Sequence, residues 1–215
     1  MSAREMLAEH DRMFVEFART LAPSDWKQQS LCSEWSNHEV LAHLVGGYSI
    51  SLPSLGSAML VNRGSFDGAN TAVARRLAGR QTPTELINTL VGLIEHPKGI
   101  GKRFPAGLLL GDHVLHHLDI ALPLGREVLI PGRIVDAVLE TEVRVPNPFV
   151  PAKTNAAGLS LRTTDTGWSF TNGRAGADSH VEGLGIHVAA ALGGRRFALT
   201  SLEGAGVTQL KDRLT

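Results

Sequence analysis

Apolar residues recur at helical spacing through the first two thirds of the chain. Between residues 2 and 21, Met6, Met13 and Phe17 fall seven and four positions apart, and Pro23 follows them. This spacing places the apolar side chains on one face of a helix. Similar patterns predict further helices over residues 37–52, 70–78, 83–96, 106–122 and 133–143.

Two of these helices carry start signals. Ser36 stands three residues before Glu39, the spacing of a capping box, in which each side chain bonds the other residue's backbone N–H. Thr82 is followed by Pro83 and Glu85, which puts proline at the first helical position and an acidic residue in the first turn. We therefore expect helices to begin near residues 37 and 83.

The pattern changes near residue 145, where three prolines and a glycine occur within residues 145–158. Such a composition is typical of a linker. Beyond it, alternating residues predict strands over 158–165 and 167–173, a helix over 179–194, a strand over 197–204 and a last helix over 206–214. We predict a mainly α protein: a helical bundle over residues 1–145 and a small α/β domain over residues 146–215.

The amino-acid composition excludes several classes of binding partner. Of 215 residues, 21 are Lys or Arg and 21 are Asp or Glu, so no excess charge attracts nucleic acid or an anionic membrane. Cys32 is the single cysteine, so an intramolecular disulfide is impossible, and no run of 18 apolar residues occurs. We expect a cytoplasmic protein that binds neither nucleic acid nor a membrane. The sequence is compatible with a homodimer.

Polar residues interrupt the apolar segment 106–122. On a helical wheel Asp112, His116 and Asp119 lie between apolar neighbours, whereas His113 and His117 fall in the remaining gap, which we expect to be a solvent edge. Burying a carboxylate and an imidazole requires compensating partners.

A bound metal ion would supply that compensation. The third ligand would be His43, on the helix that begins near residue 37, because bundles build metal sites from facing helices. Two histidines and a carboxylate suit zinc, nickel, manganese or iron, and Asp119 would orient a ligand. From spacing alone, a hydrogen-bonded cluster of Asp112, His116 and His43 without metal explains the pattern equally well.

Two segments carry a family resemblance. Residues 32–36 (CSEWS) followed by residues 39–44 (EVLAHL) resemble the Cys-Pro-Gly-Trp and Val-x-x-His-Leu signature of the mycothiol-dependent maleylpyruvate isomerase family of actinobacteria. Residues 111–120 (GDHVLHHLDI) resemble the family's acidic-x-x-x-His-x-x-Asp-Ile element. Ser33 and Glu34 replace the Pro-Gly of the first motif, and Asp112 replaces a glutamate, which shortens the acidic side chain by one methylene.

The resemblance implies a fold and a metal. It implies a DinB-like four-helix bundle that binds metal through His43, Asp112 and His116. It also implies that the metal activates the thiol of mycothiol, whose thiolate adds to an electron-poor substrate. Zinc is the first choice of metal, with nickel, manganese or iron as alternatives.

We therefore predict a metal-dependent isomerase or transferase that uses a low-molecular-weight thiol, mycothiol or a similar one, on a small electrophilic substrate. The alternative is a non-catalytic metal- or small-ligand-binding protein of the same fold, and a third possibility is a metal hydrolase with Glu39 or Asp119 as base. Cys32 invites a nucleophile hypothesis, but packing beside Trp35 explains it more simply. The sequence identifies no catalytic residue and leaves open whether the protein is an enzyme.

Overall fold

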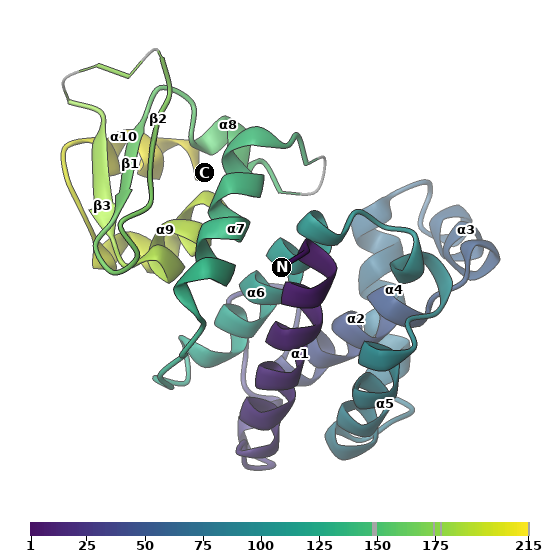
Figure 1. The fold of residues 1–215 in the computed structure, drawn as a ribbon. Helices are drawn as coiled ribbons and strands as arrows, with labels where there is room; N and C mark the ends of the chain where they lie inside the picture. The colour runs from purple at the N-terminus through teal and green to yellow at the C-terminus, as the bar shows by residue number, and fades with distance from the viewer. Residues whose placement is uncertain (148–149, 174, 177, 215) are drawn as a thin grey trace. The chain divides into compact units, whose positions relative to one another are not determined.

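The computed structural model describes residues 1–147, 150–173, 175–176 and 178–214 (Figure 1). Two groups of residues form compact units: residues 1–109 with 119–127, and residues 110–118 with 128–215. The predicted division into domains of residues 1–145 and 146–215 is a statement about which parts fold independently. It stays a prediction.

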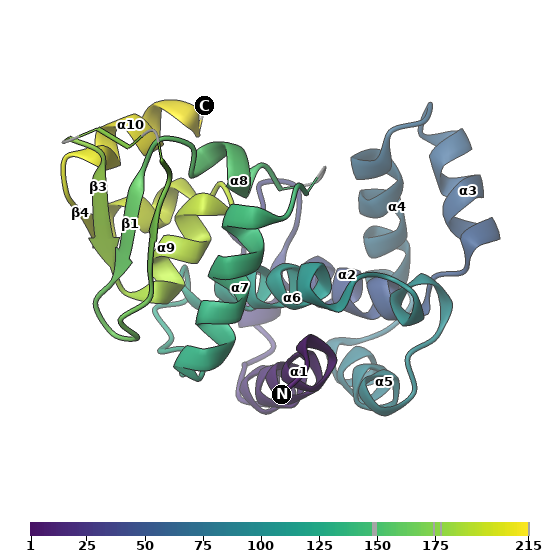
Figure 2. The same cartoon turned by 45° about the horizontal axis from the view of Figure 1, so that its top comes forward.

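The first unit is helical. Helix α2 packs against α4 and α5, α1 packs against α5, and α3 lies beside α4 (Figure 2). Capping boxes formed by Ser2, Ser36 and Thr82 start α1, α2 and α5. The helices are α1 (Ala3–Arg19), α2 (Asn37–Ser49), α3 (Leu52–Val61), α4 (Phe66–Ala78) and α5 (Pro83–Glu95), with short 3-10 helices at Asp25–Lys27 and Gly99–Lys102.

Helix α6 (Ala106–Ala121) is uninterrupted, and its ends are grouped with the first unit and its middle with the second. The expected solvent edge at His113 and His117 is wrong, because these residues are 1% and 3% exposed. Asp112, expected among apolar neighbours, has instead a side chain that is 36% exposed. The wheel orders residues around a helix, but only the packing partners decide which face meets solvent.

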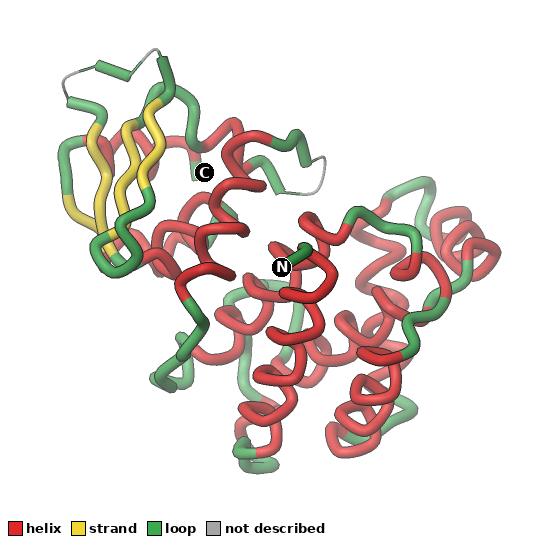
Figure 3. The backbone as a smooth tube through the Cα atoms, in the orientation of Figure 1, coloured by secondary structure: helices red, strands yellow, loops and turns green. Residues whose placement is uncertain are grey.

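The second unit combines helices with a small sheet. Its four-stranded sheet has the order β2-β1-β3-β4, in which β1 pairs antiparallel with β2 and parallel with β3, and β3 pairs antiparallel with β4. All named strands of the described chain lie in this unit (Figure 3). The elements are α7 (Gly132–Arg144), α8 (Ala152–Asn155), β1 (Ser160–Thr163), β2 (Ser169–Thr171), β3 (His180–Gly183), α9 (Gly185–Leu192), a 3-10 helix at Arg196–Ser201, β4 (Leu202–Glu203) and α10 (Gly206–Arg213).

The mainly α fold with a small α/β part is confirmed, and four local predictions need correction. The strand expected over 197–204 is mostly a 3-10 helix at Arg196–Ser201, and only Leu202–Glu203 form a strand, β4. The helix expected over 179–194 begins only at Gly185, because residues 180–183 form β3 and pair with β1. The helix from Asn37 ends at Ser49, and a separate helix, α3, starts where Ser51 caps the N–H of Ser54. Helix α4 begins at Phe66, four residues before the expected start, and α8 was not predicted.

No helix of the described residues combines the length and the hydropathy that crossing a bilayer requires. The longest of the described helices, α1, packs its buried face against α5 and carries charged residues on the opposite face.

Candidate metal centre

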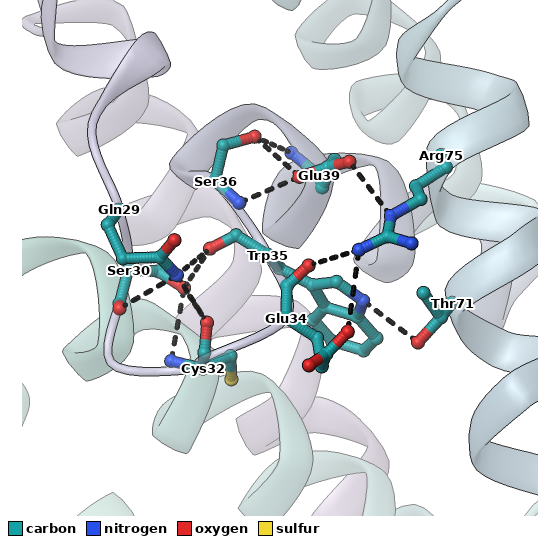
Figure 4. A network of polar contacts seen from close by, with 9 residues as sticks. All are labelled: Gln29, Ser30, Cys32, Glu34, Trp35, Ser36, Glu39, Thr71 and Arg75. Carbon is teal, nitrogen blue, oxygen red and sulfur yellow. Dashed lines mark hydrogen bonds and ion pairs between the residues drawn. The ribbon is translucent and has the colours of Figure 1, made fainter.

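The loop before α2 is closed by its own hydrogen bonds. Gln29 and Ser36 form an isolated bridge, and the Ser30 hydroxyl donates to the Trp35 carbonyl over 2.7 Å. The Gln29 amide donates to the carbonyls of Cys32, at 2.6 Å, and of Trp35, at 2.7 Å (Figure 4). These bonds fix the positions of Cys32 and Trp35.

Helix α4 holds the same loop from the other side. Trp35 Nε1 donates to Thr71 Oγ1 over 3.1 Å, and Arg75 Nη2 donates to the Glu34 carbonyl over 2.9 Å (Figure 4). Arg75 also lies 3.4 Å from a carboxylate oxygen of Glu39 in the capping box. The loop, the start of α2 and α4 therefore form one connected polar network.

His43 lies in the second turn of α2. Its side chain is 9% exposed, and its Nδ1 is 3.0 Å from Asn70 Oδ1 of α4. The Trp35 ring stacks on the imidazole with a centroid distance of 4.8 Å and an interplanar angle of 29°. Loop and α4 thus hold the imidazole by its face and by one nitrogen.

Helix α6 presents Asp112, His116 and Asp119 on one face, since they are four and three residues apart. His116 Nε2 is 3.5 Å from Asp112 Oδ1. Asp119 is fully buried, its carbonyl accepts the Leu31 N–H over 3.0 Å, and Cys32 Sγ donates to its carboxylate over 3.0 Å. The end of α6 is therefore anchored to the loop.

The three residues expected to bind metal come together. Ligand atoms of His43, Asp112 and His116 all lie within 4.8 Å of one another, and those of Cys32, His116 and Asp119 do so as well. Donor atoms about 2.0–2.2 Å from a tetrahedral zinc ion are roughly 3.3–3.6 Å apart. The spacing and the donor types of the first set fit such an ion after small side-chain adjustments.

Several site contacts could not be predicted. Asn70 and Thr71 carry no motif, and their contacts depend on which face of α4 packs against α2. The thiol contact between Cys32 and Asp119 joins residues that are 87 positions apart. The predicted proximity of Cys32 to Trp35 is seen in the loop, but the partner of its thiol is on α6.

Two other buried acids have shifted pKa values. Burial raises the pKa of Glu142 well above 4.5, against a lowering effect of the Arg195 charge. Burial, followed by the charge and hydrogen bond of Asp11, raises the pKa of Tyr48, whose hydroxyl donates to the Asp11 carboxylate. Neither group belongs to the metal-ligand sets.

The chain thus combines a helical bundle with a small mixed sheet. Ligand atoms of two histidines and an aspartate lie within 4.8 Å of one another, so the protein belongs to the class of helical proteins with a candidate metal centre. Residues 7–97 match the family model of the mycothiol maleylpyruvate isomerase N-terminal domain. This match confirms the predicted resemblance over residues 7–97.

Solved structures agree on the fold. A crystal structure of the mycothiol-dependent maleylpyruvate isomerase is 16% identical, with a TM-score of 0.58 over 95% of this chain and 93% of that chain. A histidine-to-alanine mutant of the same enzyme is 14% identical, with a TM-score of 0.60 over the same shares. No curated protein matches the chain significantly.

Proposed function

We propose that this protein is a metal-dependent isomerase or transferase that uses a low-molecular-weight thiol on a small electrophilic substrate. The observation that carries the proposal is the convergence of His43, Asp112 and His116, whose ligand atoms lie within 4.8 Å of one another. The family of residues 7–97 and the fold supply the thiol part of the proposal.

The donor set favours a divalent ion of borderline softness. Two imidazoles and a carboxylate, with a coordination position left open, are typical of catalytic zinc sites, and nickel, manganese or iron would also accept them. An ion held there would favour the deprotonated, nucleophilic form of a bound thiol. The partly exposed Asp112 side chain keeps the set from being sealed inside the core.

Residues of the chain support the ligands. Asp119 shares a face of α6 with His116 and is held by the Cys32 thiol and the Leu31 N–H, so we propose that it orients His116. In this proposal Cys32 holds Asp119 in place through its hydrogen bond and does not attack the substrate. The nucleophile is the thiol of the cofactor.

The cofactor we propose is mycothiol or a similar thiol, which places the protein in the cytoplasm of an actinobacterium. The balance of 21 basic and 21 acidic residues supports a small-molecule substrate and no nucleic acid partner. These assignments rest on the family and on composition.

Thiol-dependent turnover tests the proposal. Zinc-loaded protein is mixed with a cis-enone dicarboxylate of the maleyl type, with and without mycothiol, and isomerisation is followed by proton NMR. We expect conversion only with the thiol, and a loss of at least about 100-fold in His116→Ala, because a metal ligand is removed. Isomerisation without any thiol would contradict the thiol part of the proposal, and hydrolysis without any thiol would indicate a hydrolase. Thiol binding without turnover on this or related electrophiles would indicate a binding protein.

A further inference from the structure

The contacts around His43 single out one residue of α4 that belongs to no motif. His43 Nδ1 is 3.0 Å from Asn70 Oδ1, and both residues lie in the first unit. An amide oxygen only accepts hydrogen bonds, so the imidazole must donate through Nδ1–H. The neutral ring then carries its lone pair on Nε2.

The packing of α4 on α2 explains why Asn70 meets His43. A Cβ built on Gly46, one turn beyond His43 on α2, would lie 3.4 Å from Val73 Cγ1 and 3.5 Å from Leu77 Cδ1. Asn70, Val73 and Leu77 are three and four residues apart, so they form a row along one face of α4. Asn70 is the polar member of this row, opposite the imidazole.

Trp35 fixes the remaining freedom of the ring. It stacks on the imidazole at 4.8 Å, and its own Nε1 is bound to Thr71, the neighbour of Asn70 on α4. One helix therefore controls both the plane of the imidazole and the nitrogen that carries the proton.

We propose that Asn70 is the positioning residue that sets the tautomer of His43 and makes Nε2 the metal-binding nitrogen. The role rests on the proposed function, because it supposes that His43 is a ligand. Partners that orient a ligating histidine change metal affinity by about 10- to 100-fold when they are replaced. Trp35, held by Thr71, assists by restricting rotation of the ring.

The first experiment measures zinc affinity by competition with a chromophoric chelator. In Asn70→Leu, which removes the acceptor, the dissociation constant should rise about 10- to 100-fold. Asn70→Asp restores an acceptor, so its affinity should equal or exceed that of the wild type. Asn88 on α5 is exposed, and Asn88→Leu is the matched control with unchanged affinity.

The second experiment observes the tautomer without metal. Nitrogen-15 NMR of the metal-free protein should show the proton of His43 on Nδ1 in the wild type and in Asn70→Asp, with a shift toward Nε2–H in Asn70→Leu. A wild-type His43 protonated on Nε2 would overturn the inference, as would equal zinc affinity in the wild type and Asn70→Leu.

Asn70→Leu and Asn70→Asp together allow the inference to be refuted even if one of them does not fold. If Asn70→Leu does not fold, a loss of zinc affinity in Asn70→Asp as large as 10-fold contradicts the inference. A wild type that binds no zinc contradicts the proposed function instead, and the tautomer measurement still decides the role of Asn70.

Discussion

Glu142→Gln should stabilise the protein, and increasingly so as the pH rises. Glu142 lies on the buried face of α7 with a side chain that is almost enclosed, 8% exposed, and neither of its oxygens has a hydrogen-bond partner among the described residues. Burial raises its pKa well above 4.5, and the Arg195 charge offsets only part of this effect. The side chain therefore holds its proton in the folded state at pH values where the unfolded chain has lost it.

The sign follows from proton linkage. Between 4.5 and the raised pKa the folded state binds one proton more than the unfolded state, so its stability falls as the pH rises through this window. Glutamine imitates the protonated carboxyl but does not titrate, so it removes this loss. Each pH unit between 4.5 and the raised pKa costs the folded state about 1.4 kcal/mol of stability, and about 2–4 °C of Tm accompanies each kcal/mol in a chain of this size.

Thermal unfolding at pH 5 and pH 8 measures the effect. The Tm of Glu142→Gln should exceed that of the wild type by about 2–10 °C at pH 8, and the gap should shrink toward pH 5. Glu127 is exposed, and Glu127→Gln should leave both values unchanged. A gap that is equal at pH 5 and pH 8 would refute the argument, because it would show that Glu142 does not change its proton count on folding.

Three further predictions concern the framework of the site. Ser36→Ala removes a capping box from α2 and should cost about 1 kcal/mol in chemical unfolding, whereas Ser36→Asp, which keeps an acceptor, should cost less. Gly101→Ala should destabilise by about 1–3 kcal/mol, because its Cβ would lie 2.7 Å from the Gly47 carbonyl oxygen. Gly92→Ala, where no described atom lies within 4 Å, should stabilise α5 by about 0.5–1 kcal/mol, and an equal effect at both glycines would contradict the packing argument. Cys32→Ser keeps a donor to Asp119 and should retain wild-type stability and zinc affinity, whereas Cys32→Ala should lose about 1–3 kcal/mol; loss of turnover in Cys32→Ser with zinc affinity intact would favour a nucleophilic cysteine instead.

Local signals in the sequence predict most of the helices. The capping boxes at Ser36 and Thr82 and the apolar periodicity of α1, α5 and α6 act within a few residues, so they can be recognised without the fold. Residues 180–183 show the limit of this approach. Their strand depends on pairing with β1, some 20 residues earlier, and this non-local pairing prevails over the helical pattern of the surrounding residues.

The residues of the candidate site also fall into those that local sequence signals predict and those that depend on the fold. Asp112 and His116 can be paired from their spacing on one helix, and His43 can be added from its motif. The contacts with Asn70 and Cys32 depend on helix packing and on the folded loop, which no periodicity describes. The burial of His113 and His117 cannot be predicted from the helical wheel for the same reason, since it depends on elements that are distant in sequence.

The metal content of purified protein tests the central claim most directly. Elemental analysis after incubation with zinc, nickel or manganese and removal of the excess should find close to one divalent ion per chain in the wild type, with loss in His43→Ala, Asp112→Asn and His116→Ala. His96 at the end of α5 belongs to neither ligand set, and His96→Ala should keep the ion. A wild type that stays empty with all three metals, or ligand variants that keep their ion, would contradict the account and leave His43, Asp112 and His116 as a hydrogen-bonded cluster.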